Sequence, residues 1–239
     1  MSGHSKWAGI KHKKAAADAK RANAFTKLAN NVTVAARRGG GDILMNPTLR
    51  VAVEKARQAN MPKDNIDRAI KRGTGELGGA VAEELLYEGF AAGNVAVLVE
   101  VLTDNRNRAN ADIRQIFVKN GGRFAEGGGV AYQFAQKGVI RLEVPTGKTD
   151  IFEEIAIGGG ADDYRLEDGY AVVYVPSSEL HMLKDAYEAA GLPTSSAGIE
   201  YVAATPFEAG EEDLEKAIGL IEALEEYDDV TNVYTNLAE

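Results

Sequence analysis

The sequence predicts an α+β protein in which a basic N-terminal three-helix domain precedes two α/β domains with ferredoxin-like (split βαβ) sheets. Three observations lead to this class. Residues 1–72 carry 16 Lys and Arg against five Asp and Glu, a net charge of +11, whereas the remaining residues carry 11 against 31, a net charge of −20. Apolar residues recur at helical spacing in the basic part, and strand and helix patterns alternate in the acidic part. A chain of 239 residues suits two or three domains.

Three helices are predicted in the basic part. The first ends at the glycines of residues 39–41, because glycine readily adopts the left-handed conformation that closes a helix. The second begins at Asn46-Pro47, a side-chain cap followed by a proline in the first turn. The third begins at Met61-Pro62 and is expected to end before Gly73. The apolar stripes of the three helices comprise Phe25, Leu28, Val32 and Ala35, then Leu49, Val53 and Ala56, then Ile66 and Ile70.

The acidic part is predicted to follow a glycine-rich linker at residues 73–79. Apolar runs of strand length alternate there with amphipathic segments of helix length. The predicted strands are residues 95–102, 130–134, 139–144, 164–167, 170–175, 199–203 and 230–234. The predicted helices are residues 106–120, 150–157, 178–190 and 211–227.

The order of these elements predicts how the acidic part divides. Residues 138–205 form a β-α-β-β-α-β sequence, which closes as one sheet with both helices on one face. The preceding segment supplies β-α-β only, and the last helix and strand of the chain could complete it. The predicted domains are a basic domain at 1–77, an acidic α/β domain at 78–136 plus 206–239, and an inserted α/β domain at 137–205. The alternative that the acidic part forms two domains in simple tandem stays open.

The basic N-terminal part predicts binding to nucleic acid. Lys and Arg displace condensed counterions from phosphates, and an acidic remainder is repelled by the same polyanion, so one end of the chain should make the contact. Residues 1–20 lack apolar periodicity beyond an alanine run and are expected to form a mobile tail. The candidate nucleic-acid-binding residues are Lys6, Trp7, Lys11, His12, Lys13, Lys14, Lys20, Arg21, Lys27, Arg37, Arg38, Arg50, Lys63, Arg68, Lys71 and Arg72.

Two of these predictions have a structural alternative. Trp7 could stack on an unpaired base, or it could anchor the tail on the first helix. A second contact is expected where a strand gives way to a helix, because a helix start offers free N–H groups and a favourable dipole to anions. The alternative there is a capping turn with ordinary ion pairs. The residues of this second candidate are Asn105, Arg106, Arg108 and Arg114.

The sequence favours a non-enzymatic protein with no cofactor and no metal. It contains no cysteine, which excludes disulfides, thiolate zinc sites and thiol catalysis. The glycines at 73, 75 and 78 have dinucleotide-binding spacing but follow a helix where that site requires a strand. The acidic clusters at 211–215 and 225–229 lack the spacing of a calcium loop. With no secretory signal and no membrane span, we expect a cytoplasmic protein with neither a membrane partner nor a small-molecule substrate.

Several motifs occur together and in order along the chain. They are GHSKWAGIKHKK at 3–14, FTKL at 25–28, NPTLRVAVEKAR at 46–57, NMPKDNIDRAIKRG at 60–73, YEGF at 87–90, TDNRNR at 103–108 and DDVTNVYTN at 228–236. On these residues the chain resembles the YebC/PmpR family over nearly its whole length. The resemblance implies a helical first domain, two α/β domains and no catalytic activity. Many bacterial members are described as DNA-binding transcriptional regulators, and others are linked to the ribosome and to translation of proline-rich stretches.

The target therefore stays open between DNA and structured RNA such as the ribosome. A duplex DNA regulator normally carries a helix whose first turns offer base-reading Arg, Asn or Gln. Here the basic residues are directed at phosphates, with one aromatic among them and no clear reading helix, which favours RNA. The family descriptions as transcriptional regulators favour DNA.

Overall fold

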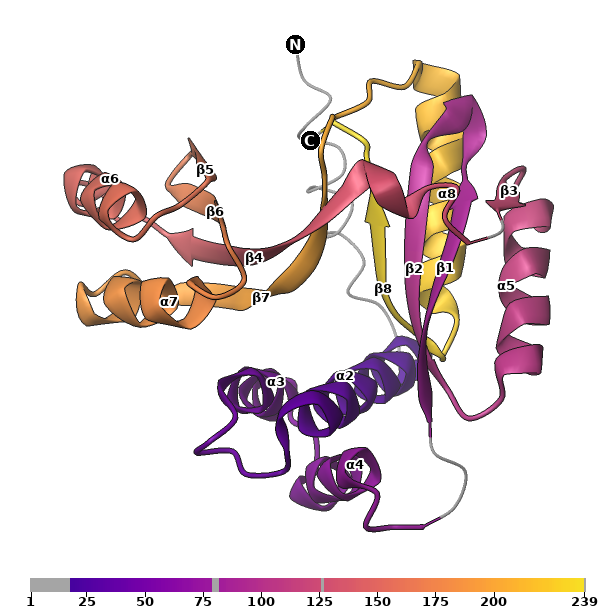
Figure 1. The fold of residues 1–239 in the computed structure, drawn as a ribbon, viewed down its shortest axis with the longest axis horizontal. Coiled ribbons are helices and arrows are strands. Elements are labelled where there is room, and N and C mark those ends of the chain that lie inside the picture. The colour runs from indigo at the N-terminus through magenta and orange to yellow at the C-terminus, as the bar shows by residue number, and fades with distance from the viewer. Residues whose placement is uncertain (1–17, 79–81, 126, 239) are drawn as a thin grey trace. The chain divides into compact units, whose positions relative to one another are not determined.

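The computed structural model of this chain describes residues 18–78, 82–125 and 127–238, and the backbone alone for residues 18–24 (Figure 1). The polypeptide forms two compact units. One contains Met1–Phe134 together with Ala203–Glu239, and the other contains Ala135–Val202. Of the predicted mobile tail, residues 1–17 lie outside the described residues, while residues 18–20 belong to the first helix.

The first part of the larger unit is a bundle of three helices, as predicted. Its core forms where the predicted apolar stripes face one another, with Val32, Leu49, Val53 and Ile66 buried among alanines and Met61. The helices are α2 (Asp18–Gly39), α3 (Pro47–Gln58) and α4 (Lys63–Thr74).

The helix ends follow the capping residues, with one exception. The Asn46 side chain accepts the Leu49 N–H at 3.0 Å, which confirms the predicted start of α3. The predicted end of α4 before Gly73 is wrong. The helix continues through that glycine to Thr74 and closes at Gly75, whose φ of 80° is the left-handed conformation that an end glycine supplies.

The rest of the larger unit is a four-stranded sheet in the order β3-β1-β2-β8. All three neighbouring pairs are antiparallel, so β2 and β3 run parallel with β1 between them, which is a split β-α-β arrangement. β8 pairs with β2, so the chain returns to this sheet after the second unit. The elements are β1 (Glu83–Phe90), β2 (Ala96–Thr103), α5 (Arg106–Lys119), β3 (Arg123–Ala125), α8 (Glu211–Glu226) and β8 (Val230–Thr235).

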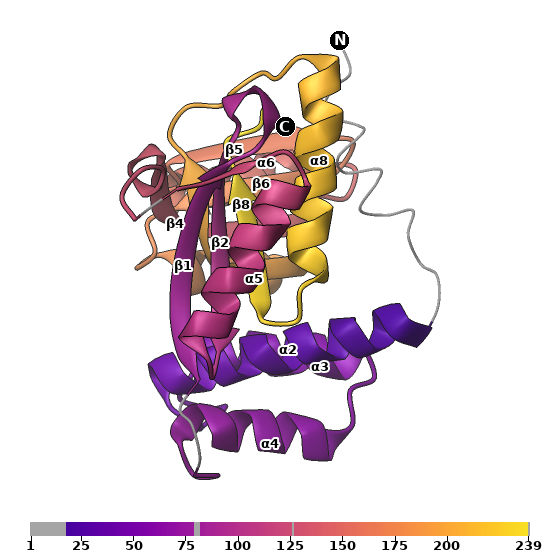
Figure 2. The same ribbon diagram turned by 90° about the vertical axis from the view of Figure 1, so that its right-hand side faces the viewer.

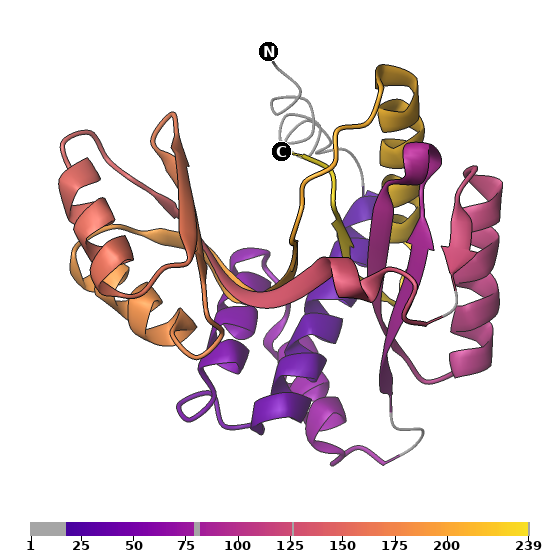
Figure 3. The same ribbon diagram turned by 45° about the horizontal axis from the view of Figure 1, so that its top comes forward.

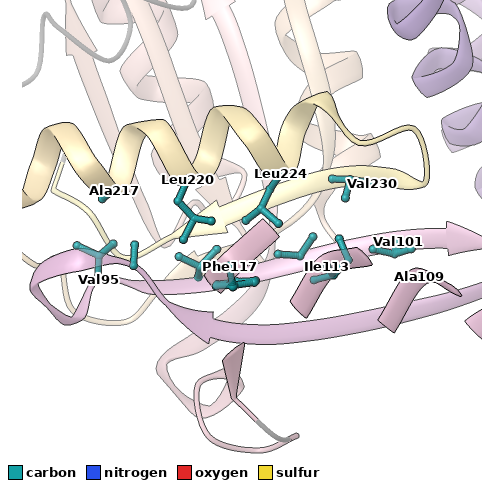
Figure 4. Packing of buried hydrophobic residues seen from close by; sticks show 12 residues of the cluster. Val95, Val101, Ala109, Ile113, Phe117, Ala217, Leu220, Leu224 and Val230 are labelled. Atoms are coloured by element: carbon teal, nitrogen blue, oxygen red, sulfur yellow. The ribbon is translucent and has the colours of Figure 1, made fainter. Parts of the chain in front are cut away.

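Helices α5 and α8 cover one face of this sheet (Figure 2). Figure 4 shows Ile113 and Phe117 of α5 and Leu220 and Leu224 of α8 meeting above the strands. Alternate residues of β2, including Val101, point into the same core. This packing fixes the start of α5 relative to β2, which precedes it in the chain. It also fixes the end of α8 relative to β8, which follows it.

The predicted strand at residues 130–134 is wrong. Residues Ala131–Gln133 form a 3-10 turn, and a single strand, β4, begins at Phe134. The cause is a buried carboxylate on β1. Glu88 accepts the backbone N–H groups of Gly128, Val130 and Ala131 at 2.7, 2.6 and 2.9 Å, so these groups are turned away from a neighbouring strand. Strands β1 and β3 were not predicted.

The second unit is a four-stranded antiparallel sheet in the order β5-β6-β4-β7. Its β-α-β-β-α-β sequence and this order are those of the predicted split βαβ sheet, and the predicted α+β class is confirmed. Figure 3 shows both helices on one side of the sheet. Phe152 and Tyr187 belong to the same buried core as Ile140 and Val173. The elements are β4 (Phe134–Glu143), α6 (Thr149–Gly158), β5 (Asp163–Glu167), β6 (Tyr170–Val175), α7 (Leu180–Ala189) and β7 (Thr194–Ala203).

Candidate nucleic-acid interface

The last turns of α2 and α4 meet at one end of the helical bundle. A Cβ placed on Gly73 of α4 would stand 2.4 Å from the carbonyl oxygen of Thr33 in α2. Beyond the end of α2, a Cβ on Gly41 would stand 2.9 Å from the side chain of Thr74. These close approaches bring together the ends of both helices and the loop at residues 40–46, and Figure 2 shows α2 and α4 side by side.

Three exposed cations occupy this end. Arg37 lies in the last turn of α2, and Lys71 and Arg72 lie in the last turn of α4. The described residues provide no ion-pair partner for any of them. A cation at a helix C-terminus is favoured by the helix dipole without losing its charge. Arg37, Lys71 and Arg72 can therefore meet phosphate oxygens, and the candidates Lys63 and Arg68 of α4 are exposed as well.

Arg50, in the first turn of α3, is committed to the loop before it. Its Nη2 donates to the Leu44 carbonyl at 2.8 Å and its Nε to the Ile43 carbonyl at 3.3 Å. The Asn46 side chain donates to the carbonyls of Ala35 and Gly40 at 2.9 and 2.8 Å. Arg50 thus holds the loop while its exposed guanidinium keeps a positive charge at this end of the bundle.

Arg38 has an acidic partner within the chain. Its guanidinium hydrogen-bonds the carboxylate of Glu84 on β1 and lies 4.0 Å from that of Glu100 on β2. Burial alone would lower the pKa of Arg38, but the hydrogen bond and charge of Glu84 outweigh it and raise that pKa. With 53% of its side chain exposed, Arg38 is only partly available to a phosphate.

Lys27 also faces acidic groups. Burial lowers the pKa of its ammonium, and the charges of Glu225, Asp228 and Glu226 act in the opposite direction. One turn further along α2, Asn30 donates its side-chain N–H to the Asp228 carbonyl at 3.1 Å. This face of α2 is therefore turned toward the end of α8, and Lys27 is less accessible than Arg37.

At the second candidate contact, the structure places a capped helix start with ion pairs. The Asn105 side chain accepts the Arg108 N–H at 3.0 Å. Arg108 pairs with Asp229 at 2.8 Å and Asp104 at 3.2 Å, and the hydrogen bond and charge of Asp229 raise its pKa. Arg114 lies over the ring of Phe124, with 4.9 Å from its Cζ to the ring centroid. Arg106 is exposed and has no ion-pair partner among the described residues.

The remaining candidates are not placed at the level of side chains. Lys20 and Arg21 lie in the first turn of α2, of which the structure describes the backbone. The candidates Lys6, Trp7, Lys11, His12, Lys13 and Lys14 lie outside the described residues.

Sequence reasoning missed two residues at the same end of the bundle. Leu44 and Met45 are each 79% exposed, in the loop between α2 and α3. The signal was present, because an apolar Ile-Leu-Met run stands between a glycine run and a helix cap, where neither strand nor helix periodicity applies.

Within the described ranges there is no cluster of acidic or imidazole side chains able to hold a metal ion. No helix in those ranges is both long and apolar enough to span a bilayer.

Comparison with known families covers both parts of the chain. The model of the TACO1/YebC protein N-terminal domain matches residues 5–76, and the model of the TACO1/YebC second and third domain matches residues 82–237. The chain belongs to the TACO1/YebC family. This confirms the resemblance found in the sequence motifs.

Similar TACO1/YebC relatives carry the name "probable transcriptional regulatory protein". The Treponema denticola relative is 49% identical over 237 residues, covering 99% of this chain and 96% of the relative. The Treponema pallidum (strain Nichols) relative is 50% identical over 236 residues, with the same two coverages. The crystal structure of a conserved hypothetical protein from Aquifex aeolicus matches with a TM-score of 0.86 and 42% identity, covering 97% of this chain and 96% of that one.

Proposed function

We propose that this chain is a cytoplasmic, non-enzymatic regulator of gene expression that binds DNA or structured RNA through its basic N-terminal domain. The observation that carries the proposal is the set of exposed, unpaired cations at one end of the bundle, Arg37, Lys71 and Arg72, among the described residues. The names of the curated relatives support a regulatory role. The proposal keeps the predicted division into domains at 1–77, 78–136 plus 206–239, and 137–205.

Charge substitutions test the proposal on the full chain. Each phosphate contact contributes a slope of about −0.9 on duplex DNA, or about −0.7 on single strands, to the dependence of log affinity on log salt. Changing Arg37, Lys71 and Arg72 together to Gln should weaken binding and make that slope shallower by about 2 to 3. Unchanged affinity and slope would remove this end of the bundle from the interface.

A matched pair controls for the loss of charge itself. Lys71 and Lys119 are both exposed lysines in the last turn of a helix, in α4 and α5. Lys71→Gln should weaken binding, and Lys119→Gln should leave it unchanged. Equal losses in the two variants would mean that net charge, not position, determines binding.

A second candidate function is a ribosome-associated translation factor that aids synthesis of proline-rich stretches. It is favoured by the placement of the exposed cations Arg37, Lys71 and Arg72 at helix C-termini, where they suit phosphates, because base-reading side chains of DNA regulators normally lie in the first turns of a helix. Purified protein can be offered ribosomes and competing linear duplex DNA at about physiological ionic strength. Retention on ribosomes supports the translation factor, and transfer to a defined promoter over random duplex supports the transcriptional regulator.

A further inference from the structure

The loop between α2 and α3 presents two adjacent aliphatic side chains to solvent. Leu44 and Met45 have the highest exposure among the large hydrophobic side chains that the structure describes, at 79% each. Single exposed hydrophobic residues are common on protein surfaces. Here two successive residues of one loop are both exposed to this degree. We call residues 42–45 the loop tip.

Hydrogen bonds fix the backbone of the loop tip while these two side chains stay free. The Asp42 carboxylate accepts the Leu44 N–H at 2.8 Å, and its carbonyl accepts the Asn46 N–H at 2.9 Å. Arg50 donates to the carbonyls of Ile43 and Leu44. The Ile43 side chain packs on the core of the bundle. Because its backbone is already fixed, the loop tip loses little backbone entropy when a partner covers it.

The surroundings of the loop tip are positive. Arg50 touches it directly, and the contact of Gly41 with Thr74 brings the last turn of α4, with Lys71 and Arg72, to the base of the loop. The acidic residues of this region are Asp42, whose carboxylate already accepts a backbone N–H, and Glu76, which accepts the Thr74 hydroxyl. Exposed aliphatic side chains beside Arg50, with the cationic last turn of α4 at the base of the same loop, fit a partner that offers apolar surface between negative groups, and nucleic acid does so at its base steps.

We propose that Leu44 and Met45 form a wedge that inserts at an unpaired, already unstacked site of a folded RNA while the surrounding cations hold the flanking phosphates. The inference rests on the proposed function and adds the feature of the target that is recognised. Leu and Met are among the side chains that proteins of the DNA minor groove insert between base steps, so both residue types are suited to contact separated bases.

The choice of an unpaired site follows from the size of the wedge. Unstacking a closed base step costs free energy of the same order as the gain from burying two aliphatic side chains. A closed step therefore leaves little net gain, whereas at a bulge the bases are already separated. Bulges and internal loops are regular features of folded RNA and are the places where proteins reach its bases.

The test compares two RNA hairpins that differ by one bulged adenosine, each with 2-aminopurine beside the bulge position. The full chain is compared with the double variant Leu44→Ser/Met45→Ser, and Val118→Ser, on an exposed position of α5, is the control. We expect the double variant to bind the bulged hairpin about tenfold more weakly, with little change on the paired hairpin and the same salt slope. The unaltered chain should change the 2-aminopurine fluorescence of the bulged hairpin, and the double variant should not.

Several outcomes overturn the proposal that the wedge recognises an unpaired site of RNA. Equal losses on both hairpins, or no loss on either, would show that the tip does not sense the bulge. A loss confined to duplex DNA would place the wedge at a kinked duplex step, and a loss confined to anionic lipid vesicles would place it at a membrane surface. If the unaltered chain binds neither hairpin nor duplex DNA, the proposed function fails as well. If it binds and the double variant binds equally, the wedge alone fails.

Discussion

The carboxylate of Glu88 accepts the backbone N–H of Val130 at 2.6 Å across 42 positions of the chain. The same carboxylate also takes the N–H groups of Gly128 and Ala131. Glu88 is 6% exposed and lies on β1, whereas the three donors lie in the segment that leads into β4 and the second unit. One buried side chain therefore sets the path by which the chain leaves the first sheet.

Replacing this carboxylate should destabilise the larger unit. Glu88→Gln removes the negative charge and brings an amide N–H₂ group toward backbone donors, so at least one hydrogen bond is lost. Hydrogen bonds to charged groups contribute about 1.5–3 kcal/mol, and we expect the free energy of unfolding to fall by about that amount. Urea unfolding followed by circular dichroism measures the change. An unchanged midpoint would show that the turn at residues 128–131 holds without Glu88.

The contribution of Glu88 should also depend on pH in a defined direction. Burial alone would raise its pKa, but hydrogen bonds from the backbone of Gly128, Ala131, Val130 and Gly129 outweigh burial and lower it. A carboxyl whose folded pKa is depressed adds stability that is present above its unfolded pKa of about 4.3 and is lost as pH falls through the folded value.

The difference in unfolding free energy between the unaltered chain and Glu88→Gln should therefore be constant near neutral pH and shrink below about pH 4. Urea titrations of both proteins at several pH values, from neutral to below about pH 4, measure this difference. A difference that grows on acidification would contradict the depressed pKa.

The same contact explains why sequence reasoning failed at residues 130–134. The Val-Ala-Tyr-Gln-Phe stretch has strand composition, but the N–H groups of Val130 and Ala131 donate to a glutamate that no local pattern connects to the stretch. The helix starts and ends were predictable because caps act over a few residues, as Asn46 does for α3. β1 was missed because its glutamates, one of them buried, interrupt the alternation of apolar and polar residues that marks a half-buried strand.

The candidate interface shows the same division between local and distant causes. The basic composition identified the N-terminal part as the candidate for nucleic-acid binding. The exposure of Arg37 and Lys71 follows from their positions on amphipathic helices. The partners of Lys27 and Arg38 come from α8, β1 and β2, far along the chain. Composition counts every cation equally, and only the folded structure separates paired from unpaired ones.

The close approach of α4 to α2 depends on a residue without a side chain. A Cβ on Gly73 would stand 2.4 Å from the Thr33 carbonyl oxygen and 2.8 Å from the Ala36 Cβ, so Gly73→Ala must push the helices apart. Overpacking of this kind costs about 1–3 kcal/mol, and we expect a lower melting temperature and weaker nucleic-acid binding.

Gly219→Ala is the control, because Gly219 lies in α8 with no atom near its missing Cβ. This variant should stabilise the chain by about 0.5–1 kcal/mol. Equal melting temperatures in the two variants would contradict the role given to Gly73.

Charge reversal separates the two arginines at the start of α5. Arg106→Glu should weaken nucleic-acid binding and make the salt slope shallower if this helix start is a second contact, because Arg106 is exposed and has no ion-pair partner among the described residues.

Arg108→Glu should instead lower the melting temperature, because it places a third negative charge beside Asp104 and Asp229. The swap Arg108→Glu/Asp229→Arg should restore part of that loss. Unchanged affinity in Arg106→Glu would exclude the second contact. If the swap restores no stability, the ion pair with Asp229 is not what Arg108 contributes to the fold.

The core of the second unit contains a hydroxyl that should be dispensable. The side chain of Tyr187 is fully buried and stacks on Phe152 with 5.6 Å between ring centroids, and no described residue forms a hydrogen bond with its hydroxyl. Burial raises the pKa of this hydroxyl, which therefore stays neutral, yet a neutral buried donor without a partner still costs folding free energy. Tyr187→Phe keeps the stacked ring and should raise the free energy of unfolding by about 1 kcal/mol.

Tyr164→Phe is the matched control, because the Tyr164 hydroxyl donates to the Glu153 carboxylate at 3.2 Å and its ring meets the same Phe152 edge-on. This variant should bring no gain in stability. Thermal unfolding of both variants decides the point, since a loss of stability in Tyr187→Phe would show that the buried hydroxyl is satisfied after all.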